Sequence, residues 1–169
     1  MADCINALKE WTGKASAAVV YDSTVDEFTH DGIFNKVKGK RNVAVIGFTT
    51  DGDVFGGFYS VAVTKQDERF MDPDMFAFSF ESHGRCMTPQ KFAVYGVKQN
   101  ANVSFWKNDR EGFVWFGMYY GGDCGFDLGD ERSDSCCWDM LDAFEGLENT
   151  TLTGNVDHHC ARLVAVQLE

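Results

Sequence analysis

The chain has 169 residues, of which 44% are hydrophobic and 24% charged, and its formal net charge is −11. These values are typical of one globular domain, residues 1–169, which folds without a metal ion or a disulfide framework. The negative charge disfavours nucleic-acid binding, because phosphate backbones repel an acidic protein.

The N-terminal segment predicts a helix followed by a strand. Apolar residues recur every third position over Cys4–Trp11, which places them on one face of a short helix. Gly13 stands where such a helix would end. Residues 1–13 are therefore expected to form a helical lead-in to the domain, and Ala17–Tyr21 a short strand.

A second helix is expected soon after this strand. Thr24 and Glu27 have the spacing of a capping box, and the helix is expected over Asp31–Lys38 with Gly39 as a left-handed cap. The cations of the chain concentrate at the end of this helix, in Lys36, Lys38, Lys40 and Arg41. Cations suit the C-terminus of a helix dipole, so a nucleic-acid site here is the weaker alternative.

The rest of the chain reads as short strands separated by turns. The expected strands are Val43–Phe48, Val54–Val63, Met75–Phe80, Phe92–Tyr95, Val103–Trp106, Phe113–Met118, Phe126–Leu128 and Leu163–Leu168. Asp51-Gly52 is a hairpin signal. Gly56-Gly57 lies inside a strand, which indicates a bulge or a close neighbour.

Strands outnumber helices and do not alternate with them, which argues against a parallel α/β sheet. The predicted fold is mainly β, of the α+β class: a two-layer antiparallel β-sandwich with a few short flanking helices. Phe76, Phe78 and Phe80 share one face of their strand and are expected in the core of the sandwich.

Neither a signal peptide nor a membrane-spanning stretch is evident in the sequence. We therefore expect a protein of the cytoplasm, with the nucleus as an alternative. The six cysteines are expected to be thiols in such a compartment.

No residue set predicts ordinary catalysis, and no cofactor is expected. The glycine-rich segment Gly121–Gly129 is not followed by a helix, so turn chemistry explains it better than a phosphate loop. The candidate zinc ligands are His158, His159, Cys160 and Cys136-Cys137. Adjacent residues point in opposite directions when extended, however, so no metal site is expected.

The cysteines leave a second class of function open. Cys136, Cys137 and Cys160, with Cys124 as a fourth, are candidate redox thiols. Such a role requires exposure and a lowered pKa. The competing interpretation is that they are small buried hydrophobic residues.

Several segments together resemble a TLDc domain. The segment Ala18–Ser23 is similar to the strand that leads into the family's early helix, and Asp51–Phe58 to its hairpin. The other matching segments are Met75–Phe80, Gly121–Leu128, the stretch from Ser133 to Phe144, and Val164–Glu169. The resemblance is strongest to short, stand-alone TLDc proteins of an amoebozoan type.

The resemblance implies which residues have a structural role in the family motifs. These are Phe55, Gly56, Gly57, Phe78, Gly121, Gly122, Phe126, Leu128, Phe144 and Glu169. It also implies a non-enzymatic protein-interaction module, a role in oxidative-stress resistance, and vacuolar proton pump subunits as partners. Loops on a rigid sandwich commonly carry function, so the turns at Asp51-Gly52 and Gly121-Gly122 are candidate contact points for such a partner; the alternative is that both are only turns.

Overall fold

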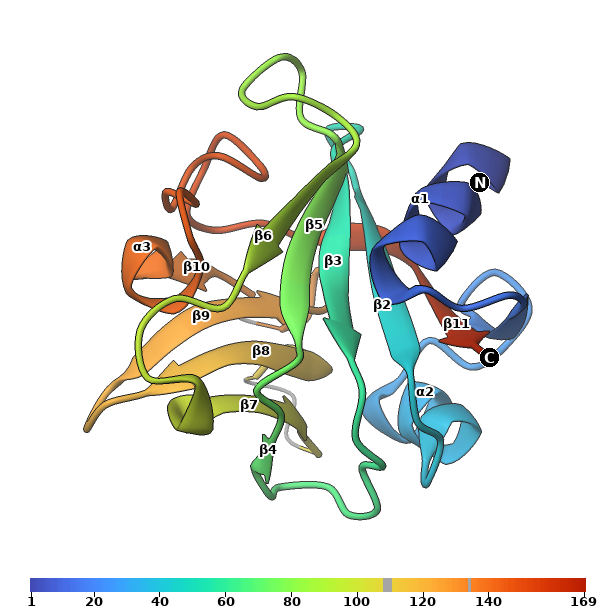
Figure 1. The fold of residues 1–169 in the computed structure, drawn as a ribbon. Coiled ribbons are helices and arrows are strands. Elements are labelled where there is room, and N and C mark those ends of the chain that lie inside the picture. The colour runs from blue at the N-terminus through green and yellow to red at the C-terminus, as the bar shows by residue number, and fades with distance from the viewer. Residues whose placement is uncertain (108–110, 134) are drawn as a thin grey trace.

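The structure is a computed structural model that describes residues 1–107, 111–133 and 135–169. In this part of the chain, two antiparallel sheets pack together and short helices flank them (Figure 1). The predicted mainly β sandwich is confirmed.

The first sheet has six strands in the described residues, and the first and last strands of the chain pair with each other in it. In spatial order the strands are β1 (Ala17–Asp22), β11 (Cys160–Leu168), β2 (Val43–Thr49), β3 (Val54–Tyr59), β5 (Phe76–Glu81) and β6 (Gln90–Ala93). The last strand of the chain lies between the first strand and the β2–β3 hairpin. The sheet is therefore complete only when β11 is in place.

The second sheet has five strands and crosses behind the first in Figure 1. In spatial order these are β10 (Cys137–Trp138), β9 (Asp123–Leu128), β8 (Val114–Tyr119), β7 (Ala101–Phe105) and β4 (Phe70–Met71). A 3-10 turn, η1 (Lys98–Asn100), precedes β7. The two-residue strands β4 and β10, like η1, were not expected from the sequence.

Among the described residues, three α-helices flank the sheets: α1 (Ala2–Thr12), α2 (His30–Val37) and α3 (Met140–Ala143). The helical lead-in is α1, which ends at Gly13 with a φ of +67°. The expected capping box is wrong. Thr29 is the N-cap of α2, and its Oγ1 accepts a hydrogen bond from the Gly32 amide at 3.0 Å. Thr24 instead donates to Asp22 at 2.8 Å.

The main core lies between the two sheets and is built largely from aromatic rings. Phe55 and Tyr59 of β3 face Phe116 and Phe126 of the second sheet, and all four are fully buried. The rings of Phe116 and Phe126 stack at 5.4 Å. Burial of each ring contributes about 1.5–3 kcal/mol, so these strands hold the two layers together.

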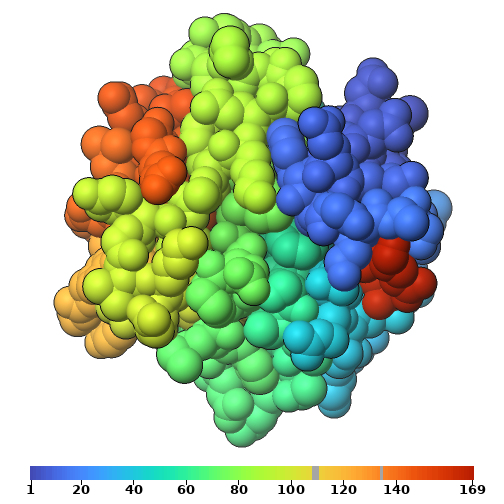
Figure 2. Space-filling model, in the orientation of Figure 1, coloured from blue at the N-terminus to red at the C-terminus, as the bar shows by residue number. Residues whose placement is uncertain are grey.

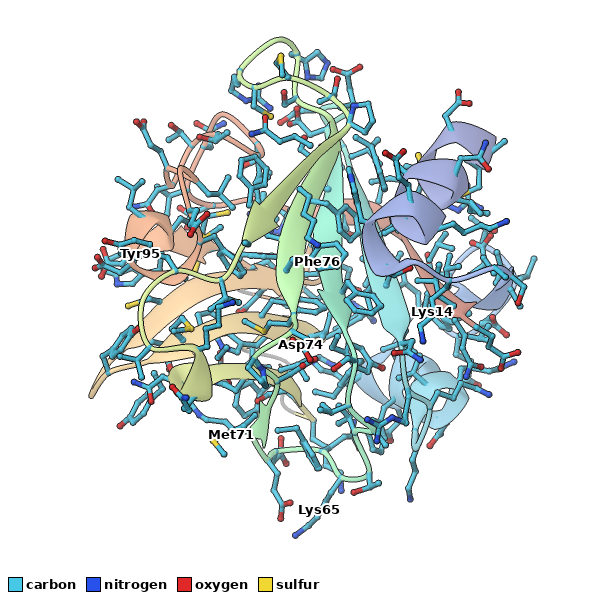
Figure 3. The ribbon with its side chains drawn as sticks, viewed as in Figure 1. Lys14, Lys65, Met71, Asp74, Phe76 and Tyr95 are labelled. Atoms are coloured by element: carbon cyan, nitrogen blue, oxygen red, sulfur yellow. The ribbon has the colours of Figure 1, made fainter. Side chains whose placement is uncertain are left out.

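The phenylalanine ladder of β5 is not in this core, contrary to the sequence-based expectation. Phe76 and Phe78 lie on the outer face of the first sheet and pack under Trp11 of α1. Figure 3 labels Phe76 on this face. Phe80 stacks on Trp11 at 5.7 Å. The small residue Ala77 faces the second sheet instead. Both faces of the first sheet are therefore covered, one by a sheet and one by a helix.

Gly56 and Gly57 sit where the backbone of β3 has no room for a side chain. A Cβ on Gly56 would lie 1.9 Å from the carbonyl oxygen of Val45, and one on Gly57 would lie 2.5 Å from the Phe116 ring. The strand ends at Tyr59 and not at Val63 as expected. After Tyr59 the chain no longer pairs with β2, because the Ser60 amide donates to an Asp72 carboxylate oxygen at 2.5 Å and not to a neighbouring strand.

Candidate functional site

The residues of the TLDc-like motifs divide between the core and the surface. The buried members are Phe55, Gly56, Gly57, Phe78, Phe126, Leu128 and Phe144. Gly121 and Gly122 are exposed in the β8–β9 turn, and Glu169 is exposed while its backbone pairs with Ser16. The buried motif residues therefore explain the fold, and a binding site has to be sought elsewhere.

The candidate thiols lie in different surroundings. Cys137 is 0% exposed and Cys160 is 2% exposed, both within the main core. Cys136 is half-buried, and its backbone bridges to Asp157. Cys124 on β9 is 8% exposed and lies at the edge of the same core, on the side of the two exposed acids Asp139 and Asp142. The four candidate thiols therefore do not share one solvent-facing site.

A histidine next to Cys137 is fixed in one tautomer by its partner. His158 Nε2 lies 2.8 Å from the backbone oxygen of Asp127. A carbonyl oxygen only accepts hydrogen bonds, so Nε2 carries the proton and Nδ1 is the unprotonated nitrogen. Nδ1 lies 4.0 Å from the Cys137 sulfur and can accept only a weak hydrogen bond from the thiol. The imidazole also packs edge-on against Phe55 at 5.1 Å.

The electrostatics of this buried group oppose nucleophilic chemistry. Burial raises the pKa of Cys137 far above the ordinary thiol range and that of Cys160 to about 12. Burial also lowers the pKa of His158, which keeps the imidazole neutral. The thiolate is the reactive form of cysteine, so both buried thiols are inert at neutral pH. A redox role for Cys136, Cys137, Cys160 and Cys124 stays a prediction, and Cys136 is more exposed than the two buried thiols.

His158 and His159 face different environments, as the extended backbone predicts. His158 is buried, whereas His159 is exposed in a shallow depression beside Arg132 and Ala161. The two imidazoles therefore do not present a paired set of metal ligands.

Asp127 is a buried carboxyl group that the sequence did not single out. Its side chain on β9 is nearly inaccessible, and Oδ2 accepts one long hydrogen bond from the Gly112 amide at 3.4 Å. No partner for Oδ1 is present in the described part of the chain. Burial raises the pKa of Asp127 to about 8, against the lowering effect of the Gly112 amide. The folded protein therefore keeps this acid protonated at neutral pH.

The most distinctive surface is a group of exposed apolar side chains, which we call the aromatic end. Its members are each 45–55% exposed. They are Tyr95, Val97, Tyr119, Tyr120, Trp138 and Leu141. Figure 2 shows the segments around residues 95–100, 119–123 and 139–150 adjoining on one side of the molecule, and Figure 3 places Tyr95 beside α3.

Hydrogen bonds hold the three segments of the aromatic end together. The Tyr95 amide donates to the carbonyl oxygen of Ala143 in α3 at 2.9 Å. The Val97 amide donates to the Tyr120 hydroxyl at 3.1 Å, which links this segment to the β8–β9 turn. Trp138 on β10 pairs with Gly125 on β9. The exposed rings are therefore mounted on a hydrogen-bonded framework.

Acidic side chains surround the aromatic end. Beside it, α3 and the following loop line a depression of about 470 Å³ that contains Asp139, Asp142 and Glu148. Asp123 at the start of β9 is paired with Arg69, whose guanidinium also stacks over Tyr119. The acids of the depression form no ion pair among the described residues. This edge of the surface is therefore apolar and negatively charged.

The two turns expected as contact points differ in their surroundings. The Gly121-Gly122 turn belongs to the aromatic end, because it connects Tyr120 with β9. The Asp51-Gly52 turn lies under the β5–β6 loop, where the buried Asp53 binds both Arg85 and His83. Arg85 also donates to the carbonyl oxygens of Thr151 and Leu152. This second turn is part of a polar network that fastens two loops.

Two lysines of the basic run at the end of α2 interact with other side chains of the fold. Lys36 forms an ion pair with Asp26 at 2.8 Å, and the Lys38 ammonium lies 5.9 Å from the centre of the Phe34 ring. Lys36 occupies the last turn of α2, as the helix-dipole interpretation expects.

Comparison with known proteins agrees with the fold. A family model described as TLDc domain matches residues 2–163. The comparison with curated proteins gives no match. In the part of the chain that the structure describes, no helix has the length and apolar character needed to cross a membrane. Since the family model covers nearly the whole chain, from α1 into β11, this protein belongs to the TLDc domain family.

Proposed function

We propose that this TLDc domain is a non-enzymatic interaction module that binds its protein partner through the aromatic end. The observation that carries the proposal is the concentration of half-exposed aromatic rings on one framework of strand ends and turns. Aromatic side chains are enriched in the centres of protein interfaces and depleted from ordinary surfaces. A contiguous exposed apolar patch on a small domain is typical of a binding surface.

The charge around the aromatic end favours a partner with a basic surface. The depression with Asp139, Asp142 and Glu148 borders the exposed Leu141. Opposite charge at the rim of an interface speeds association and fixes orientation, while the buried apolar contacts supply most of the affinity. The proposed complex therefore has an aromatic centre and a salt-sensitive acidic rim.

The family resemblance supplies the partner and the setting of this proposal. We place the protein in the cytoplasm, in the response to oxidative stress, with a subunit of the vacuolar proton pump as its partner. The inert, buried state of Cys137 and Cys160 supports interaction over thiol chemistry. The acidic surface likewise supports a protein partner over nucleic acid.

The test is binding of the purified protein to purified vacuolar proton pump, measured by co-sedimentation and by titration. Trp138→Ala and Tyr120→Ala should each weaken binding about tenfold or more, which is the loss of roughly 1.4 kcal/mol expected for an interface anchor. Val25→Ala is the control, because Val25 is 82% exposed and lies outside the aromatic end. Absence of binding, or equal binding by all variants, would contradict the proposal.

A further inference from the structure

We propose that Cys124, Asp139 and Asp142 form a binding site for a divalent transition-metal cation of the Zn²⁺ class. The sequence pattern predicts no metal site, and its candidate zinc ligands are the histidines and cysteines around His158 and Cys136, not Cys124 with these two carboxylates. The site shares Asp139 and Asp142 with the acidic rim of the proposed interface, and its metal binding is measured on the isolated protein, without a partner.

The fold brings the three side chains together from two elements. Cys124 is in β9, and Asp139 and Asp142 lie at the start of α3, which packs against β9. Asp139 is the N-cap of α3 and Asp142 lies within its single turn, where the Asp142 amide donates to the carbonyl oxygen of Asp139 at 3.0 Å. The Cys124 sulfur and one oxygen of each carboxylate all lie within 4.8 Å of one another.

The Cys124 thiol is the observation that separates this group from an ordinary acidic cluster. The residue is only 8% exposed, and its sulfur is a free thiol. Cys124 borders the main hydrophobic core on one side, where it packs as a small apolar residue. Its sulfur also lies at the surface edge of this core, within 4.8 Å of an oxygen of each of two exposed carboxylates, which an apolar role alone does not explain.

The surrounding charge favours a cation. Neither Asp139 nor Asp142 forms an ion pair within residues 1–107, 111–133 and 135–169, and Glu148 lines the same depression. The nearby cation Arg69 is occupied by Asp123 at 2.5 Å and 3.0 Å. A divalent ion would neutralise two negative charges that the fold places side by side.

The ligand types select the class of metal. One sulfur with two carboxylate oxygens suits Zn²⁺, Co²⁺ or Cd²⁺ and disfavours Mg²⁺ and Ca²⁺, which take oxygen ligands only. In tetrahedral zinc sites, ligand atoms lie about 3.5 Å from one another. Rotation of the two exposed aspartates closes the remaining gap. On binding, the thiol releases its proton to solvent and the sulfur bonds to the metal, and a water completes the coordination.

The experiment is a titration of the untagged, reduced protein with Co²⁺, followed by the near-ultraviolet charge-transfer absorption of a cobalt–thiolate bond. We expect this band in the wild type and its displacement by Zn²⁺. Cys124→Ser should abolish the band, whereas the control Cys86→Ser, which removes another thiol, should keep it. Loss of the band in both variants, or in neither, would overturn the proposal.

Asp142→Asn tests the site at an exposed position where folding is not at risk. It should weaken Co²⁺ and Zn²⁺ binding about tenfold or more, since even outer-shell changes commonly cost tenfold in metal affinity. Asp51→Asn, in the exposed β2–β3 turn, should leave the affinity unchanged. Equal affinity in the wild type and Asp142→Asn, or no binding to the wild type, would refute the assignment. Neither result depends on whether the pump binds.

Discussion

The buried acid on β9 makes a specific prediction about stability and pH. Asp127 is 3% exposed, and burial raises its pKa to about 8 in the folded protein. In the unfolded chain the pKa of an aspartate is about 3.9. Asp127→Asn replaces this acid by a neutral side chain of the same shape, which cannot ionise at any pH.

The direction of the effect follows from proton binding. Between about pH 4 and pH 8 the folded protein holds one proton on Asp127 that the unfolded chain has released. The free energy of unfolding of the wild type therefore contains a contribution that falls as the pH rises through this window. A rise of about four pH units corresponds to roughly 6 kcal/mol as an upper bound. Water penetration and relaxation reduce this value, and we expect about 2–5 kcal/mol.

The assay is urea unfolding of the wild type and Asp127→Asn at intervals from pH 4.5 to pH 8.5. The difference between the two proteins isolates Asp127 from other titrating groups. His158 is one such group, because its lowered pKa makes stability rise with pH around the unfolded histidine value. We expect the variant to gain stability over the wild type steadily as the pH rises. A difference that stays constant with pH, with Asp51→Asn as the flat control, would refute the reasoning.

Three further predictions concern the packing and the thiols. Gly56→Ala should lower the free energy of unfolding by about 3 kcal/mol or more, or prevent folding, because the added Cβ would meet a carbonyl oxygen of β2. The control Gly122→Ala should change the urea midpoint little, because no atom lies near its added Cβ. Trp11→Ala should lower the free energy of unfolding by about 2 kcal/mol, measured by thermal unfolding, because it uncovers the aromatic outer face of β5. An unchanged midpoint would mean that α1 does not pack there. Cys137 and Cys160 should resist an aromatic disulfide reagent and peroxide, read by mass spectrometry, until urea unfolds the protein; rapid labelling of either in the native state would contradict their burial.

The long strands were predictable because their sequence pattern is strong. Val43–Phe48 is an unbroken apolar run, and it forms β2, which is buried between β3 and β11. Asp51-Gly52 marked the turn of the β2–β3 hairpin, where Gly52 has a φ of +91°. In these segments the local preference and the tertiary packing agree.

The phenylalanine ladder shows what alternation alone does not decide. Alternation placed Phe76, Phe78 and Phe80 on one face of β5, and the structure agrees. It did not say which face meets the second sheet. That choice depends on α1, because Trp11 covers the large residues and leaves Ala77 to the narrow space between the sheets.

The candidate sites were missed because they depend on pairing between distant segments. β10 has two residues and α3 has four, too few to give a periodic signal. Cys124 meets Asp139 and Asp142 only because α3 packs on β9. Asp127 lies in a glycine-rich stretch that suggested a turn, whereas the stretch continues β9 into the core. Exposed aromatic residues such as Trp138 also look like core residues in a sequence.

Hydrogen–deuterium exchange of the protein alone and in complex with the vacuolar proton pump tests the proposed interface most directly. We expect slower exchange at residues 95–97, 119–123 and 138–142, which form the aromatic end, and unchanged exchange in the 82–89 loop that lies across the Asp51-Gly52 turn. Protection confined to the 82–89 loop or to α2, with the aromatic end unchanged, would contradict the proposal that this surface binds the partner.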